Sequence, residues 1–390
     1  MGDLRDDGAA HLTGATEPVV VLGATGSIGT QALEVADRLG LDVAGIAARR
    51  ISPQLVDLAE RYPQAAVVAV DHPAGHDLPT WFGVRLATGV EALDAMAATP
   101  GAVVVNGVVG CAGLRPSLAA LAAGNRLALA NKESLVAGGG LVLEAARAGG
   151  GAIVPVDSEH SAIEQCLLGE PGGIARLILT ASGGPLRGRS AAEMEAVTVE
   201  EALAHPTWDM GPRITVDSAT MMNKALEVVE AHHLFGVGYH AIDVIIHPQS
   251  VIHSMVEFVD GSVKAQMGEP DMRVPIQYAI TGARRRPGTT PPLDLGGRAL
   301  SFETPDREAF PCLELGYEAG RRGGIAPAVL NAADEVAVAA FLEGRIGFAR
   351  IARLVGSVLE QTPDRVPGSV ADVLDADGEA RRLAAELLPT

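Results

Sequence analysis

The stretch VVVLGATGSIG, residues Val19–Gly29, decides the fold of the first part of the chain. It reads as an apolar strand, a glycine-rich turn and the start of a helix. Glycine permits a tight turn and a close approach of the backbone to a ligand, and a helix N-terminus offers unpaired N–H groups to a pyrophosphate. The spacing G-x-x-G-x-x-G departs from the usual G-x-G-x-x-G, so a plain turn without a ligand is the alternative. Because the turn follows an apolar strand and opens a βαβ unit, the pattern predicts a dinucleotide-binding domain.

Outward from this stretch, short apolar runs alternate with helical patterns as far as residue 156. This alternation is typical of a parallel sheet wrapped by helices, and strands that are apolar throughout indicate a sheet covered on both faces. The predicted strands are Pro18–Leu22, Val43–Ala47, Ala65–Val70, Ala102–Val108, Arg126–Ala130 and Ala152–Val156. The predicted helices are Thr30–Leu39, Pro53–Tyr62, Val90–Ala98, Ser117–Ala123 and Leu135–Ala148.

The composition limits the class of protein. The 390 residues include 30 Lys and Arg against 48 Asp and Glu, which gives a net charge of −18. With 48% hydrophobic and 20% charged residues, two or three globular domains are expected, and the acidity argues against nucleic acid or an anionic membrane as a partner. The three cysteines, Cys111, Cys166 and Cys312, are far apart and indicate neither a disulfide framework nor a zinc site. No signal peptide or membrane span is recognised, so a soluble cytoplasmic protein is expected.

The middle of the chain changes character. Strands are predicted at Leu177–Thr180, Val244–Ile246, Val251–Phe258 and Ser262–Met267, around one long helix at Ser218–Phe235. Asp260-Gly261 between the last two strands indicates a hairpin. A Pro- and Gly-containing linker and then a helical bundle are expected to follow. The expected division is a tail at 1–17, a first domain at 18–156, a catalytic and metal-binding domain at 157–285, a linker at 286–311 and a helical domain at 312–390.

The end of the second predicted strand indicates which dinucleotide binds. An NAD site shows Asp or Glu here to hold the ribose hydroxyls, but this chain has Ala47-Ala48-Arg49-Arg50. A guanidinium at this place attracts a 2′-phosphate, which favours NADP. Two surface arginines without a ligand are the alternative.

Two carboxylates follow the predicted strand Ala152–Val156 directly. If the extended geometry continues, Asp157 and Glu159 point to the same side, at the sheet edge where ligands bind. Two adjacent carboxylates both stay ionised at low cost only if a cation joins them, and oxygen ligands suit Mg²⁺ or Mn²⁺. The alternative is that Asp157 or Ser158 is an ordinary helix N-cap.

Short polar side chains gather in three further stretches, Thr180–Pro185, His205–Pro212 and Val216–Glu227. The first ends in a glycine turn suited to anions, and the third can present an anion clamp and a carboxylate on one helix. Trp208 in the second stretch is either part of a lid over a ligand or a hydrophobic plug. His247 and His253 either line the cleft or are satisfied core histidines.

The motifs together resemble those of the 1-deoxy-D-xylulose 5-phosphate reductoisomerase family, over nearly the whole chain after the tail. They are GATGSIG at Gly23–Gly29, NKES at Asn131–Ser134, PVDSEHSAI at Pro155–Ile163, TASGGP at Thr180–Pro185, HPTWDMG at His205–Gly211, VDSATMMNKALE at Val216–Glu227, HPQSVIHSMV at His247–Val256 and GEPDMR at Gly268–Arg273. The resemblance implies an α/β protein with an N-terminal Rossmann-like NADPH-binding domain, a central α+β catalytic domain and a C-terminal helical bundle.

The resemblance also implies the roles of individual residues. The residues that match metal ligands are Asp157, Glu159 and Glu227. Those that match groups holding the substrate and its phosphate are Lys132, Ser158, Ser182, His205, Ser218, Asn223 and Lys224, with Trp208 closing over the site. Those that match the cofactor site are Thr25, Gly26, Ser27, Ile28, Ala48, Arg49, Arg50, Asn131, Glu133 and Gly211.

The activity implied is the NADPH-dependent rearrangement and reduction of 1-deoxy-D-xylulose 5-phosphate to 2-C-methyl-D-erythritol 4-phosphate, a step of the non-mevalonate route to isoprenoid precursors. Mg²⁺ or Mn²⁺, with Co²⁺ as a further option, is the implied metal, and a homodimer joined through Val251–Met267 is the implied assembly. Thr207 and Asp209 in the lid, Ala48 and Ala181 depart from the commoner family residues without removing a chemical group. The alternatives are an NADP-dependent dehydrogenase of another carbonyl substrate and a non-catalytic NADP sensor.

Overall fold

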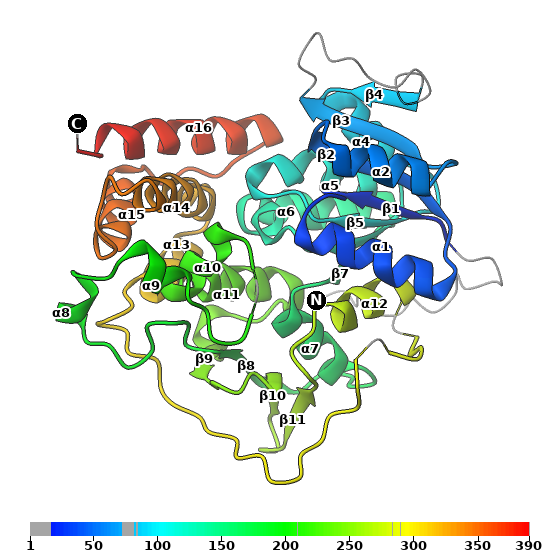
Figure 1. Ribbon diagram of the computed structural model, residues 1–390. Coiled ribbons are helices and arrows are strands. Elements are labelled where there is room, and N and C mark those ends of the chain that lie inside the picture. Colours follow the sequence, from blue (N-terminus) through cyan, green and yellow to red (C-terminus); the bar gives the residue numbers. More distant parts are fainter. Residues whose placement is uncertain are drawn as a thin grey trace.

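The computed structural model describes residues 17–71, 82, 85–208, 210–282, 284–288 and 290–389 (Figure 1). The predicted tail lies outside the described residues except for Glu17, and so does the lid residue Asp209. None of the helices in these ranges has the length and apolar character that a membrane span requires.

A seven-stranded parallel sheet forms the first part of the structure, in the order β4-β3-β2-β1-β5-β6-β7. Its strands are β1 (Val19–Leu22), β2 (Val43–Arg50), β3 (Ala66–Asp71), β4 (Leu86–Thr88), β5 (Val103–Asn106), β6 (Arg126–Leu129) and β7 (Ala152–Pro155). Six of them match predicted strands, whereas β4 was missed because this edge strand has only 3 residues, which are too few to show a pattern. The helices between them are α1 (Ser27–Leu39), α2 (Pro53–Arg61), α4 (Val90–Ala97), α5 (Leu114–Ala122) and α6 (Lys132–Gly149).

Both faces of this sheet are buried, as the apolar strands predicted. Val19 and Val21 of β1 pack in one hydrophobic core with α1, α2 and a later helix, α12 (Arg273–Thr281). Val20 and Leu22 pack in a second core with α4, α5 and α6. Successive side chains of a strand point to opposite faces, which is why the four buried residues of β1 divide between the two cores.

A second sheet has four strands in the order β11-β10-β8-β9. They are β8 (Ile174–Ala181), β9 (Ile242–Ile246), β10 (Ile252–Phe258) and β11 (Val263–Met267), and α7 (Ser158–Leu167) packs against β10 and β11. The hairpin predicted at Asp260-Gly261 is present: β10 and β11 are antiparallel, and Gly261 has a φ of 84°. The Asp260 carboxylate accepts a hydrogen bond of 2.9 Å from the Ser262 N–H, which stabilises the turn.

The prediction of one long helix at Ser218–Phe235 is wrong. Two helices occupy this stretch, α10 (Pro212–Ala219) and α11 (Met222–Phe235), and between them Met221 adopts a φ of 62°. The Thr220 hydroxyl donates to the Val216 carbonyl at 3.1 Å and accepts from the Met222 N–H at 3.3 Å, so its side chain replaces helix hydrogen bonds at the break. A left-handed backbone at a non-glycine residue is costly and clusters at functional sites, and Met221 lines the cavity described below.

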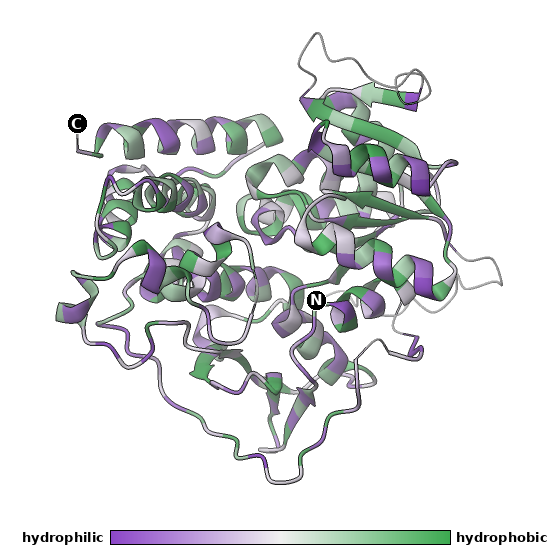
Figure 2. Cartoon of the chain, viewed as in Figure 1, coloured by the Kyte–Doolittle hydropathy of each residue, from purple (hydrophilic) through white to green (hydrophobic). Residues whose placement is uncertain are grey.

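The C-terminal part is a helical bundle, as predicted. Its helices are α13 (Cys312–Arg322), α14 (Ala326–Leu342), α15 (Arg350–Gln361) and α16 (Val370–Glu386). The apolar α14 packs against both α15 and α16 and also contacts α6 and α10 (Figures 1 and 2). Before the bundle, residues 290–311 form no helix or strand, and Glu303 pairs with Ile246 of β9 through two backbone hydrogen bonds of 2.9 Å. The remaining short helices of the described residues are α8 (Ala191–Met194), α9 (Val199–Leu203) and the 3-10 helices η1 (Gly110–Gly113) and η2 (Tyr239–Ala241).

Candidate active site

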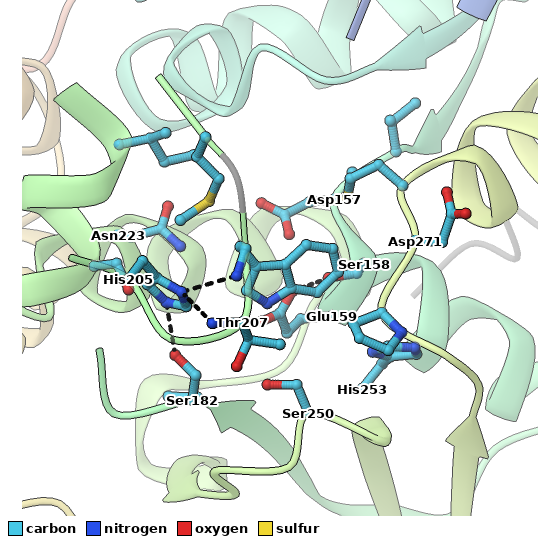
Figure 3. A pocket seen from close by; sticks show the side chains of 18 of the residues that line it. Asp157, Ser158, Glu159, Ser182, His205, Thr207, Asn223, Ser250, His253 and Asp271 are labelled. Carbon is cyan, nitrogen blue, oxygen red and sulfur yellow. Dashed lines mark hydrogen bonds between the residues drawn. The ribbon is translucent and has the colours of Figure 1, made fainter. Parts of the chain in front are cut away.

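A cavity of about 520 Å³ opens where the first sheet meets the second (Figure 3). Its walls come from the start of α1, the end of β7, the end of β8, the segment before α10 and the start of α11. Thirteen of the predicted site residues line it. These lining residues are Ser27, Ile28, Lys132, Asp157, Ser158, Glu159, Ser182, His205, Trp208, Gly211, Ser218, Asn223 and Lys224.

Three carboxylates converge beside this cavity, and two of them, Asp157 and Glu159, line it whereas Glu227 does not. Ligand oxygens of Asp157, Glu159 and Glu227 all lie within 4.8 Å of one another. The predicted reason was wrong, because the backbone does not stay extended: α7 begins at Ser158, and its first turn brings Glu159 towards Asp157. Asp157 does occupy the N-cap of α7, but its carboxylate makes no capping hydrogen bond and turns to the cluster instead. Glu227 reaches the cluster from α11 and is completely buried.

Two lysines neutralise part of this negative charge. Lys132, at the start of α6, contacts Asp157, lies 3.2 Å from Glu227 and donates to the Asn223 amide oxygen at 2.7 Å. Lys224 of α11 lies 2.7 Å from Glu159 and 2.5 Å from Glu227. Burial alone lowers the pKa of both lysines, but the surrounding carboxylates outweigh it and raise both pKa values above the usual range. Both side chains are therefore ammonium groups.

The charges of the cluster leave room for a cation. Burial, followed by the Glu227 carboxylate, raises the pKa of Glu159 from 4.5 to about 6. Burial acts to raise the pKa of Asp157 too, but Lys132 and His160 lower it overall. Three carboxylates face two ammonium groups, so one negative charge lacks a partner within the cluster. An all-oxygen set with surplus negative charge fits Mg²⁺ or Mn²⁺, the ions predicted from the sequence.

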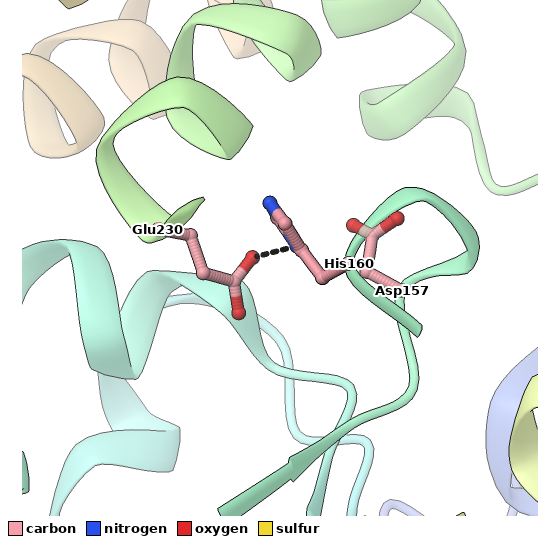
Figure 4. Close-up of side chains that lie close together, drawn as sticks. All are labelled: Asp157, His160 and Glu230. Atoms are coloured by element: carbon pink, nitrogen blue, oxygen red, sulfur yellow. Dashed lines mark ion pairs between the residues drawn. The ribbon is translucent and has the colours of Figure 1, made fainter. Parts of the chain in front are cut away.

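A second group of possible ligands, Asp157, His160 and Glu230, lies beside the first (Figure 4). The buried His160 places Nδ1 3.1 Å from the Glu230 carboxylate and Nε2 2.9 Å from the Glu227 carbonyl oxygen. Burial lowers the pKa of His160, but Glu230 outweighs burial and raises it to about 9. Both ring nitrogens already face acceptors, so neither has a lone pair available to a metal ion, and His160 instead holds the backbone at Glu227. The set of Asp157, Glu159 and Glu227 is therefore the better candidate for a cation site.

Polar groups on the opposite wall surround the segment before α10. His205 Nε2 lies 3.1 Å from the Ser182 hydroxyl, and His205 Nδ1 accepts hydrogen bonds from the Thr207 and Trp208 N–H groups at 3.1 and 3.0 Å (Figure 3). This pattern requires a proton on Nε2, which then donates to Ser182. Burial lowers the pKa of His205, so the ring is neutral. Trp208 is half-buried on the cavity wall and is not a plug in a hydrophobic core.

The glycine-rich turn has the geometry that its sequence predicted. Gly23 has a φ of 78°, and a Cβ there would lie 2.5 Å from the Gly107 carbonyl oxygen. A Cβ on Gly29 would lie 2.2 Å from the Gly23 carbonyl oxygen. No side chain caps the N-terminus of α1. Its first N–H groups are therefore available to an anion at the edge of the cavity.

Other predicted cofactor residues lie away from the cavity. Thr25 and Gly26 form the turn itself and Ala48 is buried in β2, whereas Arg49 and Arg50 extend from the end of β2 with 78% and 71% of their side chains exposed. Asn131 caps α6 by accepting from the Ser134 N–H at 3.1 Å. Glu133 lies 2.9 Å from Arg213 and is turned away from the cavity.

Several lining residues were left open or missed by the sequence analysis. His253 lies on the cavity wall, whereas His247 is buried, with Nδ1 2.9 Å from the Ser301 carbonyl oxygen and Nε2 accepting from the Val251 N–H. The neighbouring residues Gln31, Glu34, Ser250, Asp271 and Arg273 also line the cavity but were not singled out. The motif GEPDMR contains the last two, so the signal was present, but no residue pattern connected it with the cleft.

Comparison with known proteins decides the family. The family model of 1-deoxy-D-xylulose 5-phosphate reductoisomerase matches residues 19–139. The model of the 1-deoxy-D-xylulose 5-phosphate reductoisomerase C-terminal domain matches residues 153–235, and that of the DXP reductoisomerase C-terminal domain matches residues 267–383. The chain belongs to the DXP reductoisomerase family. It is 50% identical to the enzyme of Burkholderia multivorans over 382 residues, which cover 95% of this chain and 96% of the relative. It is 48% identical to the Synechococcus enzyme over 383 residues, covering 95% and 97%.

Solved structures agree with this family. The Zymomonas mobilis DXP reductoisomerase, in complex with NADPH, is 44% identical and superposes with a TM-score of 0.88, covering 96% of this chain and 99% of that one. A DXP reductoisomerase in complex with NADPH, fosmidomycin and magnesium is 37% identical with a TM-score of 0.87, covering 95% and 98%. The predicted family, α/β fold class and enzyme class are confirmed.

Proposed function

We propose that the cavity is the site at which this member of the DXP reductoisomerase family converts 1-deoxy-D-xylulose 5-phosphate to 2-C-methyl-D-erythritol 4-phosphate with NADPH and a divalent metal. The observation that carries the proposal is the cluster of Asp157, Glu159 and Glu227, with two lysines, at a cavity that the start of α1 also lines. Solved relatives in complex with NADPH and magnesium support both cofactors.

Asp157, Glu159 and Glu227 are proposed to hold the metal. A bound Mg²⁺ or Mn²⁺ supplies Lewis acidity to the carbonyl and hydroxyl oxygens of the substrate during the carbon rearrangement. Lys132 and Lys224 keep their protons, so each offers ammonium donors to oxygens that gain negative charge. Asn223 fixes this arrangement, because its amide donates to Glu227 at 2.6 Å while its oxygen accepts from Lys132.

Ser158, Ser182, Ser218 and the neutral His205 are proposed to bind the substrate and its phosphate. A phosphate is repelled by a protein with a net charge of −18, so it needs local donors. Hydroxyls and an Nε2–H group provide them without a further positive charge, and Lys224 adds one ammonium group. Trp208, at the lid, is proposed to close over the bound substrate and exclude water.

The first domain is proposed to bind NADPH along the carboxyl ends of its strands. NADPH supplies the hydride that reduces the rearranged aldehyde. The turn at Thr25, Gly26, Ser27 and Ile28 is assigned to the pyrophosphate, and Ala48, Arg49 and Arg50 to the end that carries the 2′-phosphate. We also propose that Gly211, Asn131 and Glu133 lie on the cofactor side of the site. Asn131 and Glu133 do not line the cavity; they hydrogen-bond to the backbone of Val108 and Gly110 and so position that loop.

The direct test is NADPH oxidation on addition of 1-deoxy-D-xylulose 5-phosphate, with Mg²⁺ or Mn²⁺ and again with a chelator. We expect oxidation that requires the metal and yields 2-C-methyl-D-erythritol 4-phosphate. Oxidation that persists with the chelator would favour a dehydrogenase and remove the metal role of the carboxylates. Tight NADPH binding without any turnover would favour an NADP sensor.

A homodimer is also proposed, joined through the Val251–Met267 hairpin. β11 is an edge strand whose Val263 is half exposed, and Val259 at the turn is 77% exposed. Unpaired edges with exposed apolar side chains favour pairing with a second copy. Light scattering should give twice the chain mass, and Val263→Asp should shift the protein to monomer, whereas Val366→Asp, at an exposed site far from this sheet, should not.

The domain division and the location in the cell complete the proposal. We propose the domain division 18–156, 157–285, 286–311 and 312–390. Two of its boundaries are supported by the end of β7 at Pro155 and the start of α13 at Cys312. Helix α12 belongs to the second domain in sequence but packs against the first sheet. A cytoplasmic location is supported by the three buried cysteines, which are all free thiols.

A further inference from the structure

Arg213 joins the segment before α10 to two other parts of the chain. It is the second residue of α10, just after the lid residues Trp208 and Gly211. Its guanidinium is 21% exposed and lies 2.9 Å from Glu133 and 3.1 Å from Glu335. These two partners belong to α6 and α14, so one side chain connects three helices that are distant in sequence.

The guanidinium of Arg213 donates hydrogen bonds to two acceptors in different directions. Nη1 donates to Glu133 at 2.9 Å, and Nη2 donates to the Asn331 amide oxygen at 2.9 Å. Asp217, one turn along α10, lies 3.6 Å from Nε. Glu335 is held in turn by Arg381 of α16 at 2.8 Å. A planar guanidinium with several acceptors fixes the direction of its helix more firmly than a lysine could.

The partner Glu133 connects Arg213 with the metal cluster. Glu133 directly follows Lys132 at the start of α6, where Lys132 reaches the carboxylates of the cluster. The Glu133 carboxylate also accepts from the Gly110 N–H at 3.2 Å and from the Asn131 amide at 2.8 Å, so it cannot turn freely. Arg213 therefore holds the start of α10 at a fixed distance from the first turn of α6.

The lid segment is attached at both ends. On its N-terminal side, the His205 ring lies 3.1 Å from the Ser182 hydroxyl beyond the end of β8 and accepts from the backbone N–H groups of Thr207 and Trp208. On its C-terminal side the chain passes through Gly211 into α10, whose first turn carries Arg213. The same helix carries Ser218 to the cavity wall, so any shift of α10 moves a proposed substrate-binding residue.

We propose that Arg213 is a positioning residue that anchors the C-terminal end of the lid, of which residues 205–208 and 210–211 are described, to α6 and to the C-terminal helices. It gives the lid a fixed end when it closes over the substrate. The C-terminal bundle thereby contributes to the reaction although none of its residues lines the described cavity. The inference rests on the proposed function, because the closing lid is defined by that substrate.

Arg213→Met tests the anchor, with Arg213→Lys as the conservative variant. Displacement of a positioned group by about 1 Å can cost up to about 100-fold in rate, so Arg213→Met should lower kcat/KM by about 10- to 100-fold, with a raised KM for the substrate. Arg213→Lys should fall between this variant and the wild type, because an ammonium group keeps the charge but not the planar guanidinium geometry. Arg382→Met, which removes an exposed guanidinium of α16, is the matched control and should change neither constant.

Lid closure has its own readout. The sequence contains two tryptophans, so Trp81→Phe leaves Trp208 as the only indole reporter. In that background, substrate and NADPH together should change Trp208 fluorescence in the wild type, and Arg213→Met should reduce the change. Glu335→Gln, which keeps Arg213 but weakens one contact, should move KM in the same direction by roughly 2- to 5-fold.

The outcomes separate the anchor from a merely structural role. An unchanged KM and an unchanged Trp208 response in Arg213→Met and Glu335→Gln, with only a lower melting temperature, would overturn the inference. Absence of turnover by the wild-type protein would instead overturn the proposed function itself.

Discussion

Selectivity for NADPH over NADH should depend on the pair Arg49 and Arg50. The perturbation is the double substitution Arg49→Ala and Arg50→Ala. Both guanidinium groups extend from the end of β2, and in the free protein they lie 2.9 and 3.8 Å from the Asp71 carboxylate of β3. A bound 2′-phosphate would take the place of Asp71 as their partner.

The magnitude follows from their exposure. A hydrogen bond between charged groups contributes about 1.5–3 kcal/mol when shielded, but these side chains are 71–78% exposed, so about 1 kcal/mol for each is appropriate. The sum of about 2 kcal/mol corresponds to a roughly 30-fold rise in the KM for NADPH. NADH has no 2′-phosphate, so its KM should stay nearly constant.

The assay is the initial rate of oxidation of NADPH and of NADH at saturating substrate and Mg²⁺. Asp71→Asn should act in the opposite direction, because it removes a competing carboxylate, and should lower the KM for NADPH by roughly 2- to 5-fold. Arg61→Ala is the control, since Arg61 is an exposed arginine of α2 that pairs with Asp37. Equal changes for both cofactors in the double variant would refute the assignment of the 2′-phosphate site.

Three further substitutions test the other parts of the site. Glu227→Gln should leave the circular dichroism spectrum unchanged but lower Mn²⁺ affinity by more than about 100-fold, because a buried carboxylate ligand becomes neutral. A Mn²⁺ dissociation constant close to that of the wild type would show that Glu227 is not a metal ligand. The pKa of Glu159 is raised from 4.5 to about 6 in the folded protein. Without metal, the protonated Glu159 therefore contributes about 2 kcal/mol to the free energy of unfolding below pH 4.5, and this contribution is lost as the pH rises through 6. Because the metal needs the ionised carboxylate, Mg²⁺ binding should weaken as the pH falls below 6. Glu159→Gln should abolish both dependences in thermal unfolding and calorimetry, and a pH profile like that of the wild type would contradict this. His205→Ala should raise the substrate KM by about 10-fold, since it frees the Thr207 and Trp208 N–H groups; steady-state kinetics that match the wild type would argue against that role.

Local sequence predicted the parts of the structure that depend on neighbouring residues. The strand, turn and helix at Val19–Gly29 could be recognised because strand polarity, glycine content and helix periodicity all act within a few residues. The hairpin at Asp260-Gly261 is of the same kind. The break at Met221 could not be predicted, because helical spacing continues through it and only the Thr220 hydroxyl and the packing around it decide the backbone there.

The motifs also indicated most of the residue types at the site, but not their arrangement. Asp157 and Glu159 were expected to converge through an extended backbone, and they converge through the first turn of α7 instead. The sequence could not show that Lys132 lies between Asp157 and Glu227, since these residues come from three separate elements.

The sequence by itself determined the family, the glycine turn and the carboxylates available to a cation. Only the tertiary structure decided that Glu227 is wholly buried beside two lysines, that burial and the Glu227 carboxylate raise the pKa of Glu159, and that Arg213 joins the lid to α6 and α14. The physical reason is the same for both: burial and charge coupling depend on which distant segments pack together, and no local pattern contains that distance.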